Sequence, residues 1–455
     1  MSLSAELAER AVALDYDRFE SEAIKWARDA ITDMIGCALL GAPTDTTSMA
    51  IASGMNNAGP ALVLGRRRRL AILDAALVNG ASGHALDYDD TSKSLSGHPT
   101  VVIVPGLLAL AEVRNSSGRD FVDAYIVGVE LATRFARGVN FYHYEKGWHP
   151  TATLGIFGAA AAACRLLRLS AAQTANAIAM AASLASGVKA NFGTITKPMH
   201  AGFAARNGLF AALMAEQNVP ASPVAFEHPQ GFLEVFNGAG NYTIEKMLTG
   251  WGQPLDLLAP GISIKKYPCV YSTHGAIDAA IHIKQTEKPD PAQIGKVVVR
   301  MHRRRMLPHV LNPATSALNA KFSLPYAVSR GLVTGAVTLE HFEDSALNDK
   351  NVQRVMNLIE MDPHQDDSND YGAEVIVTMN DGRQLTAAVA APLGRGPETP
   401  LPAEMLRSKF IDCATRSLNE KSAGDVFEML MALDSLPTVN VLTAAIEAAT
   451  TRTSA

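Results

Sequence analysis

Residues 149–167 read HPTATLGIFGAAAAACRLL, and this stretch predicts the character of most of the chain. Pro150 suits the first position of a helix, because its missing N–H would be unsatisfied there and its φ is already helical. The small glycine and alanine residues that follow allow neighbouring helices to approach one another closely. The stretch therefore predicts a helix packed inside a compact helical bundle.

Two further helix-like runs begin in the same way, with a basic residue directly before a proline. They follow His98-Pro99 and Lys197-Pro198, just as the first run follows His149-Pro150. A residue before proline is disfavoured in the α region, so each side chain is expected at the mouth of its helix. Free N–H groups and the positive end of the helix dipole favour anions there. Three such positions predict a pocket for a small anion with several charges.

The composition is that of a well-buried globular protein. The chain has 455 residues, 48% apolar and 19% charged, which is enough for two domains. A net charge of −5 and a pI near 6.2 argue against nucleic acid as a partner. The four cysteines lie far apart, which predicts reduced thiols in a cytoplasmic protein and no cysteine metal site. The sequence has neither a signal-peptide pattern nor an apolar run of membrane-spanning length, so no membrane partner is expected.

The helical pattern changes after about residue 264. Strands are predicted at 296–302, 373–379 and 383–391, and the last two flank Asn380-Asp381-Gly382, a strong hairpin signal. Helical stretches lie between these strands, and helical pattern returns after residue 396. We therefore predict a discontinuous all-helical domain of residues 1–264 and 397–455, with an α+β domain of residues 265–396.

The densest polar segment is residues 84–98, HALDYDDTSKSLSGH. If this region is helical, His84, Asp87 and Thr91 share one face. An aspartate beside histidines can orient an imidazole or act as a base, so Asp87 is expected to be functional. For Asp89 and Asp90 a helix cap or a solvated acidic turn is the competing interpretation.

Two more segments carry polar side chains at the predicted helix mouths. A lone histidine such as His149 is more often structural, but a helix N-terminus tends to keep a histidine neutral and fit to act as a base. Residues 191–200, NFGTITKPMH, contain Lys197 and lack the spacing of a phosphate loop. We expect Lys197 to bind a ligand, with a surface lysine as the alternative.

The segment that opens the second domain is also polar. Residues 264–274 read IKKYPCVYSTH, and boundaries between domains commonly form clefts, so Lys265 and His274 are candidate ligand residues. Tyr326 follows on a helical stretch. A core tyrosine with one satisfied hydroxyl is an equally good interpretation of that residue.

Five motifs in this order resemble the 2-methylcitrate dehydratase (MmgE/PrpD) family, which also includes cis-aconitate decarboxylases and iminodisuccinate epimerases. They are HALDYDDT, the HP that follows, GWHPTATLG, GTITKPMHAGFAARNG and IKKYPCVYSTH, and they span most of the chain. The resemblance implies a mainly α protein: a large all-helical domain formed by both chain ends and a smaller α+β lid domain. It also implies a homodimer and a cofactor-independent, metal-free active site in the cleft between the domains.

The resemblance also implies which residues form the site. The residues expected to act in catalysis are Asp87, His98, His149, Lys197 and Tyr326. Those expected to bind the substrate are Thr91, Lys197 and Lys265. His274 is added to them from its place in the polar segment 264–274, not from the resemblance.

The function expected from these features is that of a lyase acting on a small polycarboxylate. We expect dehydration of a 2-methylcitrate-like hydroxy-polycarboxylate, in which a base removes a proton next to a carboxylate and water is lost. Epimerisation of a small dicarboxylate such as iminodisuccinate is the alternative, because it shares the first step. Decarboxylation is less favoured: the decarboxylase motif has a histidine five residues after the lid lysine, where this chain has Val270, and the Thr91–His98 spacing is one residue longer. A non-catalytic relative is the least favoured, because the polar set is intact.

Overall fold

The structure is a computed structural model that describes residues 1–306, 310–311 and 314–451. The chain packs as two compact units, Met1–Ile264 with Pro402–Ala455 and Lys265–Leu401. Helices make up 58% of the chain and strands 10%. This confirms the prediction of a mainly helical protein with one helical part and one smaller part built on a sheet.

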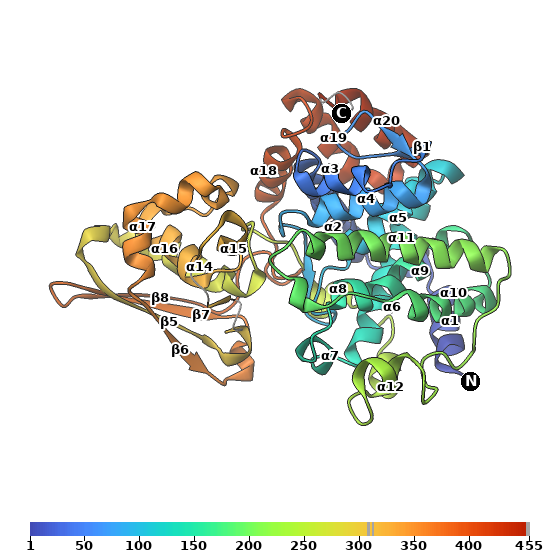
Figure 1. Cartoon of the computed structure of the whole chain (residues 1–455), viewed down its shortest axis with the longest axis horizontal. Coiled ribbons are helices and arrows are strands. Elements are labelled where there is room, and N and C mark those ends of the chain that lie inside the picture. The colour runs from blue at the N-terminus through green and yellow to red at the C-terminus, as the bar shows by residue number, and fades with distance from the viewer. Residues whose placement is uncertain (307–309, 312–313, 452–455) are drawn as a thin grey trace. The chain divides into compact units, whose positions relative to one another are not determined.

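The first unit is built from helices contributed by both ends of the chain. The N-terminal part supplies α1 (Leu3–Ala13), α2 (Ser21–Gly41), α3 (Asp45–Ala52), α4 (Ile72–His84), α5 (Thr100–Arg114), α6 (Gly118–Arg137), α7 (Tyr142–Glu145), α8 (Pro150–Thr153), α9 (Gly155–Leu166), α10 (Ala171–Leu184), α11 (Thr196–Glu216), α12 (Phe232–Asn237) and α13 (Ile244–Leu248). The C-terminal part supplies α18 (Ala403–Ala414), α19 (Glu420–Met431) and α20 (Val439–Ala449). In Figure 1, α18 and α19 lie beside α2, far from them in sequence.

The centre of the first unit depends on small residues, as the alanine-rich stretch predicts. Helix α11 packs against α4, α9 and α5, and α9 packs against α6. Where α11 crosses α4, a Cβ on Gly202 would lie only 2.4 Å from the Leu77 carbonyl oxygen. Where α6 crosses α9, a Cβ on Gly158 would lie 2.5 Å from the Gly128 carbonyl oxygen. Larger side chains at these crossings would force the helices apart.

The prediction that this unit is all-helical is wrong in detail, because it also contains two short antiparallel strand pairs. One pair joins β1 (Ala58–Leu62) to β2 (Arg69–Leu70), and the other joins β3 (Thr91–Ser92) to β4 (Ile262–Ser263). Pro60 lies in β1, and a proline in the interior of a helix would remove a backbone hydrogen bond, so a helix is disfavoured there. Strand β3 directly follows the polar segment 84–90. Strands β2, β3 and β4 have two residues each, too few for a period-two pattern, and β1 does not alternate regularly between buried and exposed residues.

The second unit is a four-stranded sheet covered by helices. Its strands are ordered β6 (Ile359–His364), β5 (Ile294–His302), β7 (Ala373–Met379) and β8 (Gln384–Val389); β5 and β6 are parallel and the other neighbours antiparallel. Its helices are α14 (His274–Glu287), α15 (Ala317–Ala320), α16 (Leu324–Thr334) and α17 (Lys350–Met356). Helix α14 packs on β7 and β8, and α16 packs on α14 (Figure 1).

The sheet confirms the predicted hairpin and adds a strand that the sequence pattern missed. β7 and β8 pair antiparallel around Gly382, whose φ of 88° suits glycine in a tight turn. In β7, residues alternate between buried and half-buried from Ala373 to Met379, so one face meets the core. Strand β6 falls partly within a stretch predicted as helical, because α17 ends at Met356 and the chain turns into the sheet within three residues.

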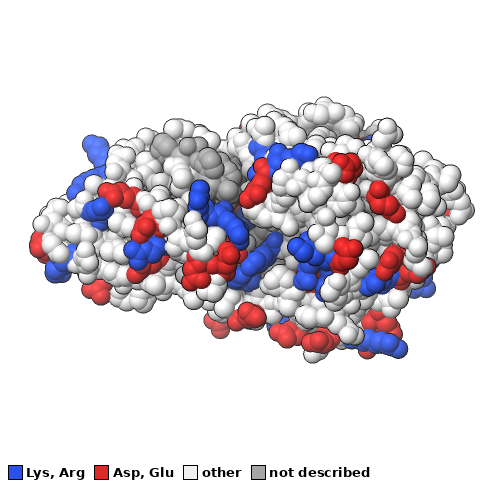
Figure 2. Space-filling model, turned by 90° about the horizontal axis from the view of Figure 1, so that it is seen from below, with Lys and Arg blue, Asp and Glu red and all other residues white. Residues whose placement is uncertain are grey.

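Charge on the surface is mixed in sign. On the face drawn in Figure 2, most lysine and arginine side chains have an aspartate or glutamate beside them. Across the described ranges, no helix combines the length and apolarity that crossing a bilayer requires.

Candidate functional site

The three basic residues before prolines all lie at helix starts, though not in the same way. His149 is the extended residue that precedes α8, with Pro150 in its first turn, as predicted. His98 lies two residues before α5, which begins at Thr100. Lys197 differs from the prediction, because α11 begins at Thr196 and Lys197 is already helical in spite of the proline after it. Tertiary packing of the buried Lys197 side chain has overridden the local preference.

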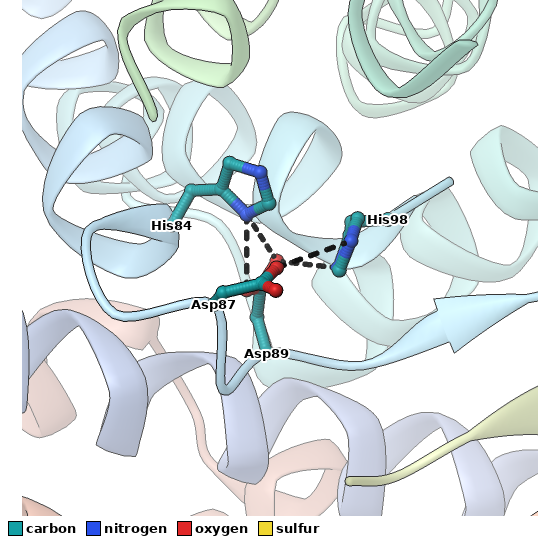
Figure 3. Close-up of side chains that lie close together, drawn as sticks. All are labelled: His84, Asp87, Asp89 and His98. Carbon is teal, nitrogen blue, oxygen red and sulfur yellow. Dashed lines mark hydrogen bonds and ion pairs between the residues drawn. The ribbon is translucent and has the colours of Figure 1, made fainter. Parts of the chain in front are cut away.

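The segment from His84 to Asp90 is a loop rather than a helix. α4 ends at His84, and Asp87 has a left-handed backbone with a φ of 54°. Aspartate tolerates this region better than most residues. The prediction of a shared helical face for His84, Asp87 and Thr91 is therefore wrong. The loop itself turns the carboxylate of Asp87 back toward the end of α4, as Figure 3 shows.

The loop brings two carboxylates between two imidazole rings (Figure 3). Both carboxylate oxygens of Asp89 lie within 3.0 Å of His84 Nδ1, and Asp89 Oδ2 lies 3.1 Å from His98 Nδ1. Asp87 Oδ1 lies 3.6 Å from His98 Nε2. The rings of His84 and His98 meet edge to face at 4.5 Å. Asp89 and Asp90 are fully buried, so the interpretation as a solvated acidic turn is wrong.

Lys197 joins this group from α11. Its Nζ lies 2.8 Å from Asp87 Oδ1 and 5.4 Å from the centre of the Phe192 ring. Both Lys197 and Asp87 are buried. A buried ammonium can bind the carboxylate of a ligand through charge-assisted hydrogen bonds.

His149 also contacts the His84 ring and lies among other aromatic rings. The two rings stack with centres 5.8 Å apart, and Phe192 meets His149 edge to face at 4.9 Å. His149 Nδ1 lies 3.1 Å from His200 Nδ1, three residues after Lys197 on α11. We call His84, Asp87, Asp89, His98, His149, Lys197 and His200 the polar cluster; all seven belong to the first unit.

Electrostatics divide the polar cluster into two kinds of environment. Burial, with Lys197 next in importance, lowers the pKa of His149 well below its ordinary value. Burial also lowers the pKa of His84 to about 4, although Asp89 opposes this, and burial and Lys197 lower that of His200. For Asp89, burial raises the pKa, but the histidines His84 and His98 outweigh it and hold the pKa well below the ordinary range. The site therefore contains neutral imidazoles beside an ionised carboxylate.

The loop that carries the two carboxylates is anchored from the C-terminal helices. Lys409 on α18 donates to the Tyr88 carbonyl at 2.8 Å and lies 2.5 Å from Asp33 Oδ1. Burial raises the pKa of Asp90 well above its ordinary range, and this carboxyl contacts the Thr100 hydroxyl. The carboxylate of Asp89 therefore contacts the histidines His84 and His98, whereas the carboxyl group of Asp90 contacts an uncharged hydroxyl group.

The segment between Thr91 and His98 is held close to α8. The His98 N–H donates to Thr151 Oγ1 at 3.1 Å, and the Thr91 hydroxyl donates to the Gly97 carbonyl at 3.1 Å. A Cβ on Gly97 would lie 2.7 Å from the Thr151 nitrogen, so only glycine permits this approach. Thr91 therefore positions the chain next to His98.

The carboxylates and imidazoles also raise the question of a metal ion. One donor atom from each of His84, Asp87, Asp89 and His98 lies within 4.8 Å of the others. These donors are already engaged: Asp89 with both imidazoles and Asp87 with the Lys197 ammonium. A cation bound at Asp87 would sit beside that ammonium and be repelled by it. The residues present therefore suit a hydrogen-bonded acid–base group better than a metal centre.

The remaining predicted residues belong to the second unit. Lys265 and His274 are buried, and His274 begins α14 with its Nε2 atom 3.4 Å from the Cys269 carbonyl. The Tyr326 hydroxyl donates to the His341 carbonyl and accepts from Arg330 Nε at 3.0 Å, as a core tyrosine would. Val270, where the decarboxylase motif has histidine, packs against the apolar core of this unit.

Asp89 and His200 belong to the polar cluster although the sequence did not single them out as site residues. His84 was noticed only as a neighbour of Asp87. Residues 84–98 contain several histidines and aspartates, and this local enrichment could have pointed to His84 and Asp89. Nothing local marks His200, because its role depends on a contact with a residue 51 positions away.

Comparison with known proteins adds the family to this geometry. Residues 5–245 match the model of the MmgE/PrpD N-terminal domain, and residues 267–434 match that of the C-terminal domain. The cis-aconitate decarboxylase of Homo sapiens is 29% identical over 393 residues, covering 82% of this chain and 79% of that protein. A cis-aconitate decarboxylase-like protein of Aspergillus oryzae is 28% identical over 480 residues, covering 98% and 97%. The cis-aconitate decarboxylase of Aspergillus terreus is 26% identical over 472 residues, covering 97% and 95%.

The two family matches together cover most of the chain and follow one another in the order of the predicted motifs. They include every member of the polar cluster as well as His274 and Tyr326. This chain belongs to the MmgE/PrpD family.

Proposed function

We propose that this protein is a metal-independent lyase that acts on a small polycarboxylate. The observation that carries the proposal is the buried polar cluster, in which one lysine, two carboxylates and neutral imidazoles lie within contact of one another. Such a group can bind a carboxylate and move a proton at the adjacent carbon.

Each residue has a role in the proposed reaction. Lys197 binds the substrate carboxylate next to the acidic carbon, and its charge stabilises the negative charge that develops there. His149 is the base, because burial and Lys197 keep it neutral at physiological pH. His98, in contact with Asp87 and Asp89, is the acid that protonates the leaving group. Thr91, whose hydroxyl donates to the Gly97 carbonyl, keeps the chain in place next to His98.

We propose dehydration as the reaction, because the cluster separates a base from an acid. Loss of water requires both: one group removes a proton from carbon, and another protonates the departing hydroxyl. In the first unit these are His149 and His98, each in contact with the His84 ring. The proposed substrate class is a 2-methylcitrate-like hydroxy-polycarboxylate.

Decarboxylation is the second candidate, and the relatives favour it. The three proteins named above are cis-aconitate decarboxylases or resemble them. Val270 argues in the other direction, because an apolar core residue stands where the decarboxylase motif has an ionisable one. The identity of 26–29% leaves room for a different reaction on a related acid.

One experiment separates these reactions. The purified protein is incubated in D₂O with 2-methylcitrate, citrate, cis-aconitate and iminodisuccinate, one acid at a time. Formation of an unsaturated acid from a hydroxy acid supports dehydration. Release of CO₂ would instead show that the protein is a decarboxylase. Deuterium uptake without a new double bond indicates epimerisation. No reaction with any acid would contradict the proposal.

A chelator tests the metal-free part of the proposal. Dialysis against EDTA followed by assay in metal-free buffer should leave turnover unchanged, because the Lys197 ammonium already neutralises Asp87. Loss of turnover that added Zn²⁺ or Mn²⁺ restores would show that the carboxylates hold a metal.

The proposal includes a homodimer in the cytoplasm. Phe203 and Phe210, two turns apart on α11, are 42% and 37% exposed, and a second copy could cover them. Sedimentation should give twice the mass of one chain, and a Phe210→Glu variant should lower it if this face is the contact.

A further inference from the structure

The contact between His149 and His200 has a geometry that restricts how both rings carry their protons. Their Nδ1 atoms lie 3.1 Å apart in a buried setting. Two nitrogens at this distance form a hydrogen bond only if one of them is protonated and the other is not. The contact therefore couples the tautomer of His149 to that of His200.

The hydrogen bond described for the ring of His149 is the one with His200. The His149 ring also stacks on His84 and meets Phe192 edge to face. Its backbone is held as well, because the His149 N–H donates to the Gly187 carbonyl at 3.0 Å. His200 is thus the contact that selects which nitrogen of His149 faces the rest of the polar cluster unprotonated.

We propose that His200 is the positioning residue for His149: it accepts the Nδ1 hydrogen of His149, leaves Nε2 free as the base, and receives the proton's charge during the reaction. This inference rests on the proposed function for the identity of His149 as the base. In the resting state His149 carries its hydrogen on Nδ1, and His200 carries its hydrogen on Nε2.

The proton balance of the step is simple. His149 Nε2 takes a proton from the carbon next to the substrate carboxylate, and the bonding pair stays on the substrate. The Nδ1 hydrogen of His149 then moves along the 3.1 Å contact to His200 Nδ1. His149 ends neutral with its hydrogen on Nε2, and His200 ends as an imidazolium protonated on both nitrogens.

The charges around the pair favour this direction of transfer. Burial lowers the pKa of His149, and Lys197, His84, His200 and His98 lower it further. For His200, the groups that lower the pKa are fewer: burial and Lys197. His200 also keeps a slightly exposed surface, whereas His149 is more enclosed. Positive charge is therefore better tolerated on His200 than on His149.

The tautomer can be measured without any turnover. The ¹⁵N chemical shifts of the histidine rings at pH 7.5 in the full-length protein should show His149 protonated on Nδ1 and not on Nε2. In a His200→Leu variant, His149 should switch to the Nε2–H form or to a mixture of forms. Nε2 protonation in the unsubstituted protein, or no change in the variant, would overturn the proposal.

Kinetics then test the consequence for the reaction. His200→Leu should lower kcat by about 100-fold with KM changed less than threefold, because the substrate contacts remain while the base is misaligned. His200→Asn puts an amide oxygen near the Nδ1 position, so it should recover about tenfold of the lost kcat and shift the acid limb of the pH profile. Equal kcat in the Leu and Asn variants would contradict the acceptor role.

His143 supplies a matched control. It is buried like His149, its pKa is also lowered to about 4, chiefly by burial, and its two nitrogens contact Asn237 Oδ1 and Thr153 Oγ1 at 2.8 Å. His143→Leu should lower the unfolding midpoint but leave the His149 tautomer unchanged. If no polycarboxylate is turned over, the proposed function fails, while the ¹⁵N measurement still decides the tautomer.

Discussion

The two histidines that contact the His84 ring, His98 and His149, differ in the charges around them, although both belong to the first unit. His98 touches the carboxylates of Asp87 and Asp89. His149 touches His200, and Lys197 is the charge that most disfavours its protonation. Two histidines of the same chemistry are thereby given opposite environments. This difference in surroundings is the reason why the proposed function gives the two histidines different roles.

The largest effect on turnover is expected from removing His149 or Lys197. His149→Ala and Lys197→Ala should each lower kcat/KM by about 10³-fold or more, because one removes the base and the other the stabilising charge. Circular dichroism should show both variants folded. Near-normal turnover in both would mean that this cluster is not the active site.

A smaller effect is expected from weakening the carboxylate side. Asp89→Asn keeps the shape but removes the charge shared by His84 and His98, so kcat should fall about 100-fold. Asp90→Asn is the matched control: burial raises the pKa of this neighbouring carboxyl well above its ordinary range, so its amide analogue should change kcat less than threefold. Equal losses in the two variants would refute the distinction between them.

The buried histidines also predict how the free energy of unfolding depends on pH. Burial lowers the folded-state pKa of His84 to about 4 and that of His149 well below 6.5, so the unfolded chain takes up protons first as pH falls. The free energy of unfolding should therefore be highest above pH 6.5 and should decrease below it. Each such histidine contributes a slope of about 1.4 kcal/mol per pH unit.

Urea unfolding between pH 7.5 and 5 measures this slope. A His149→Gln variant lacks one of the titrating groups, so its slope should be smaller by the contribution of one proton. His143, with a pKa also near 4, adds to the slope in both proteins and cancels in the comparison. An identical slope in both would mean that His149 is protonated in the folded state as readily as in the unfolded chain.

The smallest effect is expected from Tyr326, which belongs to the second unit. Its hydroxyl is already engaged by the His341 carbonyl and Arg330 inside the second unit. Tyr326→Phe should therefore lower kcat less than tenfold, with most of the change in stability. A larger loss of kcat in a folded variant would support the prediction from the sequence that Tyr326 acts in catalysis.

Several features could be predicted from the sequence because they depend on neighbouring residues. Pro150 marks the start of α8, Asn380-Asp381-Gly382 marks the hairpin, and small residues at positions such as Gly158 mark close helix crossings. The motif order identifies the family for the same reason, since each motif is a short contiguous string. Asp87, His98, His149 and Lys197 could be proposed as site residues on this basis.

The tertiary structure alone decided which groups meet and which charge each carries. The left-handed backbone at Asp87 turned a predicted helical face into a loop, and burial turned Asp89 from a solvated residue into the shared partner of two histidines. His200 acquired its role from a contact across 51 residues. Proton affinity depends on desolvation and on nearby charges, and both are properties of packing that no local pattern of residues encodes.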